Sequence, residues 1–137
     1  MPASTHISLS ELQALIKRGI DNAHPLPYWV TAEISELKVN YSGHCYIELV
    51  EKGGANHVPK AKASAVIWRS GYSMIASYFQ GATGQVLAAG LKVLVKVVVS
   101  YHELYGLSLQ ITDIDPTYTL GDMERQRHET IRRLRQD

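Results

Sequence analysis

The sequence predicts a small, mainly β protein in which five strands form a barrel, a helix separates the third strand from the fourth, and one further helix lies at each end. Three observations support this prediction. Apolar residues recur at every second position in five separate segments, and helical spacing interrupts these segments once, between the third and the fourth. The chain has 137 residues, of which 45% are apolar and 20% charged, as is usual for a single folded domain.

Residues 8–22 are predicted to form a short amphipathic helix. Ser8 and Glu11 have the spacing of a capping box, in which side chains satisfy the free amides of the first helical turn. The two prolines of "HPLPYW" then end the helical pattern, because proline has no amide hydrogen to donate. Residues 1–27 are therefore expected to be a helix followed by a proline-rich connection.

Alternation of apolar and polar side chains predicts the first three strands in residues 28–37, 44–52 and 61–68. In the second strand, Cys45, Ile47 and Leu49 are expected to face the interior, which leaves Tyr46 pointing outward. The stretch "YSGH" before and into this strand is predicted to be a turn. The glycine-rich stretch "GGANHVPK" after it is predicted to connect the second strand to the third.

A helix is predicted in residues 70–80, where apolar side chains return to helical spacing ahead of two glycines. Two further alternating segments, residues 91–101 and 106–115, are predicted to be the fourth and fifth strands. Five strands with a helix between the third and fourth follow the order of the OB-fold, a small Greek-key barrel whose second and third strands bind oligonucleotides and oligosaccharides. We expect this barrel to span residues 28–118.

Residues 119–137 are predicted to form a C-terminal helix, with Asp122 as its cap and five arginines along its length. Its apolar stripe is thin and consists of Met123, Ile131 and Leu134, so the helix is expected to pack on another part of the protein. Neither glycine nor proline follows to end the helix, which favours the interpretation that the sequence is a fragment of a longer protein.

The charges are placed unevenly along a chain whose formal net charge is only +1. No acidic residue occurs between Glu51 and Glu103, although that interval contains six basic residues: Lys52, Lys60, Lys62, Arg69, Lys92 and Lys96. The interval indicates either a positive field suited to phosphates or a surface whose counter-charges come from elsewhere in the fold. The sequence leaves both interpretations open.

The sequence lacks the groups of residues that several kinds of catalytic or metal site require. The six histidines are widely scattered around one cysteine, so no zinc site is predicted. Cys45 is expected to be a buried structural residue, because His44 would lie on the opposite face of the strand. Asp113 and Asp115 are expected to form a turn before Pro116. No metal, cofactor or catalytic residue is therefore assigned.

The sequence also bears on location. The single cysteine excludes an internal disulfide, and the N-terminus lacks the pattern of a secretory signal. The longest apolar run, "VLAAGLKVLVKVVV", is interrupted by lysines well short of the roughly 20 residues that a membrane-spanning helix needs. A cytoplasmic protein without a membrane partner is expected.

A set of aromatic and basic residues remains, and such a set suits single-stranded nucleic acid, because any base can stack on an aromatic ring while cations meet the phosphates. The candidate residues are Lys38, Tyr41, Ser42, Gly43, His44, Tyr46, Lys62, Trp68, Arg69, Tyr101 and Tyr105. Tyr46 and Trp68 are placed outward on the second and third strands, with a core or interface position as the alternative for each. Tyr101 and Tyr105 are either barrel plugs or a lip of the groove.

Five stretches, in order along nearly the whole chain, resemble the N-terminal region of the exodeoxyribonuclease VII large subunit: "WVTAEISELK", "YSGHCYIELVEK", "VIWRS", "SYHELYGLSLQITDIDP" and "LGDMERQRHETIRRL". The resemblance implies an OB domain that holds single-stranded DNA for an enzyme that degrades it to oligonucleotides. It places cleavage in a following catalytic domain, toward which residues 119–137 would lead, and association with small subunits in a helical C-terminal part. The fragment itself is then expected to be non-catalytic.

The sequence departs from that family's pattern in the first strand and after the second. Ala32 stands where the family usually has glycine, and Glu36 stands where it usually has asparagine, so phosphate contacts near Glu36 would be weaker. The stretch "GGANHVP" lengthens the connection after the second strand. Two other functions stay open, namely a barrel whose aromatic face docks on protein and one that binds RNA in the manner of transfer-RNA anticodon-binding domains.

Overall fold

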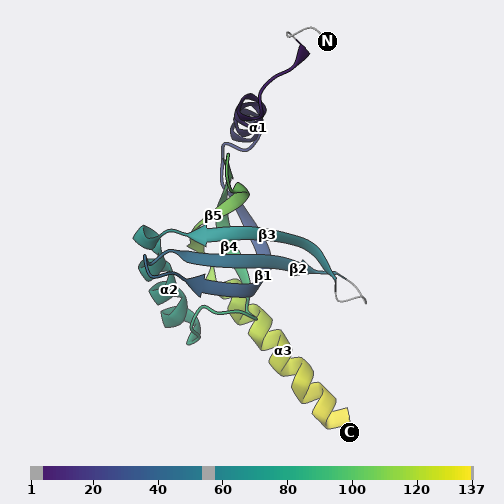
Figure 1. Cartoon of the computed structure of the whole chain (residues 1–137). Coiled ribbons are helices and arrows are strands. Elements are labelled where there is room, and N and C mark those ends of the chain that lie inside the picture. The colour runs from purple at the N-terminus through teal and green to yellow at the C-terminus, as the bar shows by residue number, and fades with distance from the viewer. Residues whose placement is uncertain (1–4, 54–57, 137) are drawn as a thin grey trace.

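A computed structural model of the chain describes residues 5–53 and 58–136, with side chains described as far as residue 130. The helices and strands in chain order are α1 Leu9–Ala23, β1 Tyr28–Val39, β2 Cys45–Lys52, β3 Pro59–Ile67, α2 Arg69–Thr83, β4 Lys92–His102, β5 Gly106–Ile114 and α3 Pro116–Gln136. The strands form a closed barrel in the order β1-β2-β3-β5-β4 (Figure 1). The predicted five-stranded barrel with a helix between the third and fourth strands is confirmed.

The long strand β1 holds the barrel together by pairing with two neighbours. Its first half, Tyr28 to Glu33, is antiparallel to β4, and its second half is antiparallel to β2. A register shift between Ile34 and Glu36 lies where the strand passes from one partner to the other, as expected of a bulge that bends a strand. A short parallel pairing of β3 with β5 closes the barrel.

The barrel interior is filled by inward-facing side chains of all five strands, by two buried side chains of α2, and by one leucine of the connection between α2 and β4. Cys45, Ile47 and Leu49 are buried, as the alternation in β2 predicts. Ile75 and Phe79 of α2 join this cluster, and Phe79 is fully buried. Helix α2 is therefore anchored in the core by the apolar side of its second and third turns.

The boundary between β3 and α2 differs from the prediction. Strand β3 begins at Pro59, earlier than expected, and ends at Ile67, so Trp68 is the residue that precedes α2 and not a strand residue. The predicted connection 53–60 is correspondingly shorter, and its residues 54–57 lie outside the described part of the chain. Trp68 thus stands at a corner where the chain turns from the barrel wall into a helix.

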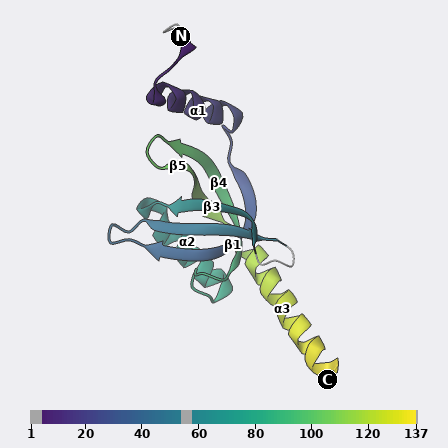
Figure 2. The ribbon, with the colours of Figure 1, turned by 45° about the vertical axis from the view of Figure 1, so that its right-hand side comes forward.

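Helix α1 begins as predicted, because the Ser8 hydroxyl accepts a hydrogen bond from the Glu11 amide at 3.1 Å. None of its residues is buried, although its leucine and isoleucine side chains form an apolar stripe. Figures 1 and 2 show α1 beyond the tip of the hairpin formed by β4 and β5, separated from the rest of the barrel. The helix is therefore held by few contacts.

The prediction that Asp122 caps the C-terminal helix is wrong. Helix α3 already begins at Pro116, and Asp115 Oδ1 accepts hydrogen bonds from the amide and the hydroxyl of Thr117. Proline is favoured in the first helical position because no partner for its missing amide hydrogen is needed there. Asp122 lies inside the helix, nearly buried, with Lys92 Nζ at 3.6 Å. Ile131 and Leu134, two residues of the predicted apolar stripe, lie beyond the part of the chain whose side chains the structure describes.

Candidate nucleic-acid interface

The turn between β1 and β2 is closed by backbone hydrogen bonds and depends on one glycine. The Asn40 amide donates to the His44 carbonyl and the Gly43 amide donates to the Asn40 carbonyl, each at 3.0 Å. Gly43 has φ +93°, a left-handed conformation that side-chain-bearing residues rarely adopt. A Cβ at this position would also lie 3.0 Å from Cγ of Arg69. The predicted turn is therefore present, and it packs against the start of α2.

His44 joins this turn to the start of α2. The Arg69 amide donates a hydrogen bond to His44 Nδ1 at 3.0 Å, so Nδ1 must carry a lone pair and the ring proton lies on Nε2. The rings of His44 and Trp68 meet edge to face, with centroids 5.1 Å apart and planes at 87°. Gly43, His44, Trp68 and Arg69 thus form one group, which we call the turn–helix cluster.

Trp68 points outward from this cluster. Its side chain is 43% exposed, so Trp68 does not lie in the core. Tyr46 is 46% exposed on the outer face of β2, directly opposite Lys38 of β1. Tyr41 is fully exposed at the tip of the turn, while Ser42 beside it is half-buried. The candidate residues of the first three strands therefore share one side of the barrel with the turn–helix cluster.

The basic interval is partly neutralised once the chain is folded. Lys62 Nζ lies 3.3 Å from Glu48 Oε2, and two other lysines of the interval pair with carboxylates: Lys52 with Glu33 at 3.2 Å, and Lys92 with Asp122 at 3.6 Å. For these three lysines the structure therefore favours the interpretation in which counter-charges come from elsewhere in the fold. Among the ion pairs between described residues, none includes Lys38 or Arg69, which leaves those two cations accessible to phosphates.

An open groove of about 260 Å³ runs between β3 and the beginning of β5, where the two strands diverge. Its walls consist of Lys62, Ala63 and Ser64 on one side and Leu107, Ser108 and Leu109 on the other. Leu107 is 58% exposed although the alternation in this strand groups it with the apolar Leu109 and Ile111. The β5 side of this groove was not among the predicted site residues, because no sequence pattern reveals where two paired strands separate.

The turn between β4 and β5 presents one of its tyrosines to solvent. Tyr105 is 81% exposed and stacks on His102, with ring centroids 4.6 Å apart and planes at 28°. It is therefore not a barrel plug, whereas Tyr101 is half-buried on β4. Since Tyr105 stands two residues before Leu107, this turn lies at the end of the groove between β3 and β5.

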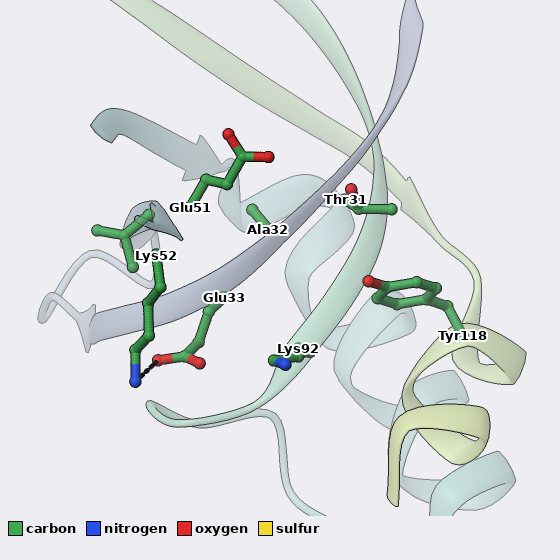
Figure 3. Close-up of a pocket in the computed structure, with 8 residues that line it drawn as sticks. Thr31, Ala32, Glu33, Glu51, Lys52, Lys92 and Tyr118 are labelled. Carbon is green, nitrogen blue, oxygen red and sulfur yellow. Dashed lines mark ion pairs between the residues drawn. The ribbon is translucent and has the colours of Figure 1, made fainter. Parts of the chain in front are cut away.

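A second pocket, of about 220 Å³, lies where β1, the end of β2 and the start of β4 meet the first turn of α3 (Figure 3). Glu33 and Lys52 form an ion pair across it, and Lys92 and Tyr118 lie on its other side. No local sequence pattern reveals this pocket, because its residues come from four elements. Its charges are balanced, and none of the predicted site residues lines it.

The described residues contain no group of three His, Cys, Asp or Glu side chains placed to hold a metal ion. In this same part of the chain, no helix is long and apolar enough to span a membrane. Asp115, capping α3, has its pKa lowered by the hydroxyl and amide of Thr117. Burial raises the pKa of the Cys45 thiol to about 11.

The buried thiol gives a first prediction. At pH 8 Cys45 is expected to react with a disulfide reagent far more slowly in the native protein than in denaturant, because the reactive thiolate is suppressed and enclosed. The raised pKa means that the folded state favours the neutral thiol. The resulting contribution to the free energy of unfolding is complete below the ordinary pKa of 9.0 and is lost as the pH rises through about 11. Equally fast labelling of native and denatured protein at pH 8 would contradict the burial.

The match to a family model agrees with the barrel geometry. Residues 7–115 match the family described as OB-fold nucleic acid binding domain. The exodeoxyribonuclease 7 large subunit of Deinococcus radiodurans is 38% identical over 125 residues, which cover 88% of this chain and 30% of that protein. The chain thus spans about a third of that relative. A solved dimeric N-terminal domain of PriB protein from Thermoanaerobacter tencongensis superposes with a TM-score of 0.44 at 11% identity, covering 66% of this chain and 94% of the other.

Proposed function

The chain belongs to the family of OB-fold nucleic-acid-binding domains, and from this premise we propose that it is the single-stranded-DNA-binding domain of an exodeoxyribonuclease VII large subunit. In this proposal the domain binds and positions a strand that other parts of the longer protein degrade to oligonucleotides. The chain itself then holds no catalytic residue. Contacts with a small subunit are assigned to the part of the large subunit that this sequence does not include.

The turn–helix cluster is the observation that supports this proposal most directly. Trp68 offers an accessible ring on which any base can stack, and Arg69 beside it is a cation without a carboxylate partner among the described ion pairs. Gly43 has no Cβ to press on the Arg69 side chain, so the turn can lie against the start of α2 and keep Arg69 beside Trp68. Stacking combined with charge is the usual way in which proteins bind single strands without reading their sequence.

The remaining candidates extend the proposed path of the strand away from this cluster. Tyr46 and Lys38 would continue it across β2 and β1, and the groove beside Lys62 would lead to Tyr105. At Lys62 a phosphate would compete with the carboxylate of Glu48, which also accepts a hydrogen bond from the Ser35 hydroxyl at 2.9 Å. We therefore expect Lys62 to contribute less to phosphate binding than Arg69.

The experiment that tests the proposal is a titration of the purified chain with a fluorescent oligodeoxythymidine at several salt concentrations. Binding with a logarithmic salt slope of about −0.7 per phosphate contact is the expected result. The absence of binding at low salt would instead favour a protein-docking barrel, and stronger competition by RNA than by DNA would favour an anticodon-binding type of domain. The same oligonucleotide, recovered after incubation, is expected to be uncut.

A second prediction concerns Arg69. Replacing Arg69 with alanine is expected to reduce the steepness of the salt dependence by about 0.7, because one phosphate would then keep its counterion. The matched control is Arg18→Ala, which removes the same charge from an exposed position on α1. An unchanged slope for Arg69→Ala, or an equal change for the control, would show that Arg69 makes no specific phosphate contact.

A further inference from the structure

Helix α1 is attached to the turn between β4 and β5 by two polar contacts. Gln13 Nε2 donates a hydrogen bond to the backbone carbonyl of Glu103 at 2.7 Å, and Lys17 Nζ lies 3.7 Å from Glu103 Oε1. Gln13 and Lys17 are one helical turn apart and therefore share a face of α1. Both side chains reach the same residue, one at its backbone and one at its carboxylate.

Glu103 belongs to a turn whose residues are fixed to one another. The Leu104 amide donates to His102 Nδ1 at 3.0 Å, and the His102 ring stacks on Tyr105. The turn ends at Gly106, whose φ of +77° needs a glycine. The pKa of Glu103 is lowered by a hydrogen bond from its own backbone amide and by the charge of Lys17. Whatever holds Glu103 therefore also limits where the ring of Tyr105 can lie.

We propose that α1 is a brace for this turn, in which Gln13 and Lys17 are positioning residues that hold Tyr105 at the end of the β3–β5 groove for stacking on a base. The inference rests on the proposed binding of single-stranded DNA. An exposed turn loses conformational freedom when a ligand orders it, and ordering it beforehand removes part of that cost from binding. Figure 2 shows α1 lying across the outer end of the hairpin, which is the position from which it can contact the turn.

The brace also explains an otherwise isolated helix. Helix α1 buries none of its residues, so core packing does not fix its position. Besides the two contacts with Glu103, His24 Nδ1 lies 2.8 Å from the Tyr28 hydroxyl in the connection that follows α1. This connection contains Pro25 and Pro27, whose fixed backbone angles limit how far α1 can swing away from the hairpin. The position of α1 is thereby restricted at the middle of the helix and at its C-terminal end.

The test compares oligodeoxythymidine affinities of charge-reversal variants. Lys17→Glu places a carboxylate against Glu103, whereas Arg18→Glu changes the net charge equally at a position rotated by roughly 100° around the helix. Lys17→Glu is expected to bind about two- to fivefold more weakly than Arg18→Glu. Combining Lys17→Glu with Glu103→Lys restores an ion pair and is expected to recover the affinity. Gln13→Ala, which removes the second contact without a change of charge, is expected to weaken binding in the same direction.

A coupling measurement separates a brace from a direct phosphate contact. In a Tyr105→Ala background, Lys17→Glu and Arg18→Glu are expected to bind equally, because the residue that α1 positions has been removed. A difference that persists without Tyr105 would overturn the inference, as would equal affinities of the two variants in the unmodified protein. In both cases binding by the unmodified protein would leave the proposed function standing, whereas its failure to bind would reject both.

Discussion

Replacing Trp68 with alanine is expected to weaken oligonucleotide binding by about 1–3 kcal/mol, or roughly 5- to 150-fold, while the barrel stays folded. The ring is 43% exposed and its edge contact with His44 lies at the surface, so truncation removes a stacking platform and leaves no core cavity. The salt slope should hardly change, because stacking displaces no counterions. Fluorescence anisotropy titrations at two or more salt concentrations measure both quantities.

Trp29 provides the matched control for this experiment. It is the other tryptophan of the chain, is 50% exposed, and lies on the half of β1 that pairs with β4. Trp29→Ala is expected to retain nearly full affinity, and the protein that keeps only Trp68 should show a fluorescence change on binding. A Trp68→Ala protein that loses several kcal/mol of stability in a thermal melt, or equal affinity losses for the two variants, would remove the stacking assignment.

Replacing Phe79 with alanine is expected to lower the free energy of unfolding by about 3–5 kcal/mol. Phe79 is fully buried, and together with Ile75 it is the side chain by which α2 enters the core. The cavity left behind is surrounded by strands of a closed barrel, which cannot easily collapse to fill it. Chemical denaturation monitored by circular dichroism gives the free energy directly.

Tyr78 is the appropriate control because it is the preceding residue of the same helix and is 55% exposed. Tyr78→Ala is expected to cost less than about 1 kcal/mol, since little of its ring is removed from water in the native state. Equal losses for Phe79→Ala and Tyr78→Ala would mean that α2 contributes through helix propensity and not through the core. At temperatures well below its melting point, Phe79→Ala should still bind the oligonucleotide.

The fold was predictable because alternation along each strand records which side chains are buried. Cys45, Ile47 and Leu49 are an instance in which this local pattern was enough. The start of α3 was predicted wrongly because Asp115 and Asp122 are both acceptable caps by composition. Pro116 was the available signal, since proline is favoured as the first helical residue and Asp115 directly precedes it.

The candidate site was predictable in its residue types but not in its connections. His44 and Arg69 come from separate elements, and no local pattern could show that the amide of one meets the ring nitrogen of the other. The pairing of Lys62 with Glu48 likewise depends on the register between β2 and β3, which brings the lysine within 3.3 Å of the carboxylate. Sequence charge runs therefore overestimate a local field wherever neighbouring strands supply the opposite charge.

The divided pairing of β1 has a consequence for how quickly the protein can fold. The half of β1 that faces β2 needs only the closure of a short turn, whereas Tyr28 must find Val97, and Glu33 must find Lys92, across the whole length of β2, β3 and α2. Closing so large a loop reduces the conformational entropy of the chain before the contacts between the strands can stabilise it. We expect the β1–β2–β3 meander to assemble early and the docking of β4 to limit the rate, which places folding in the millisecond-to-second range typical of barrels.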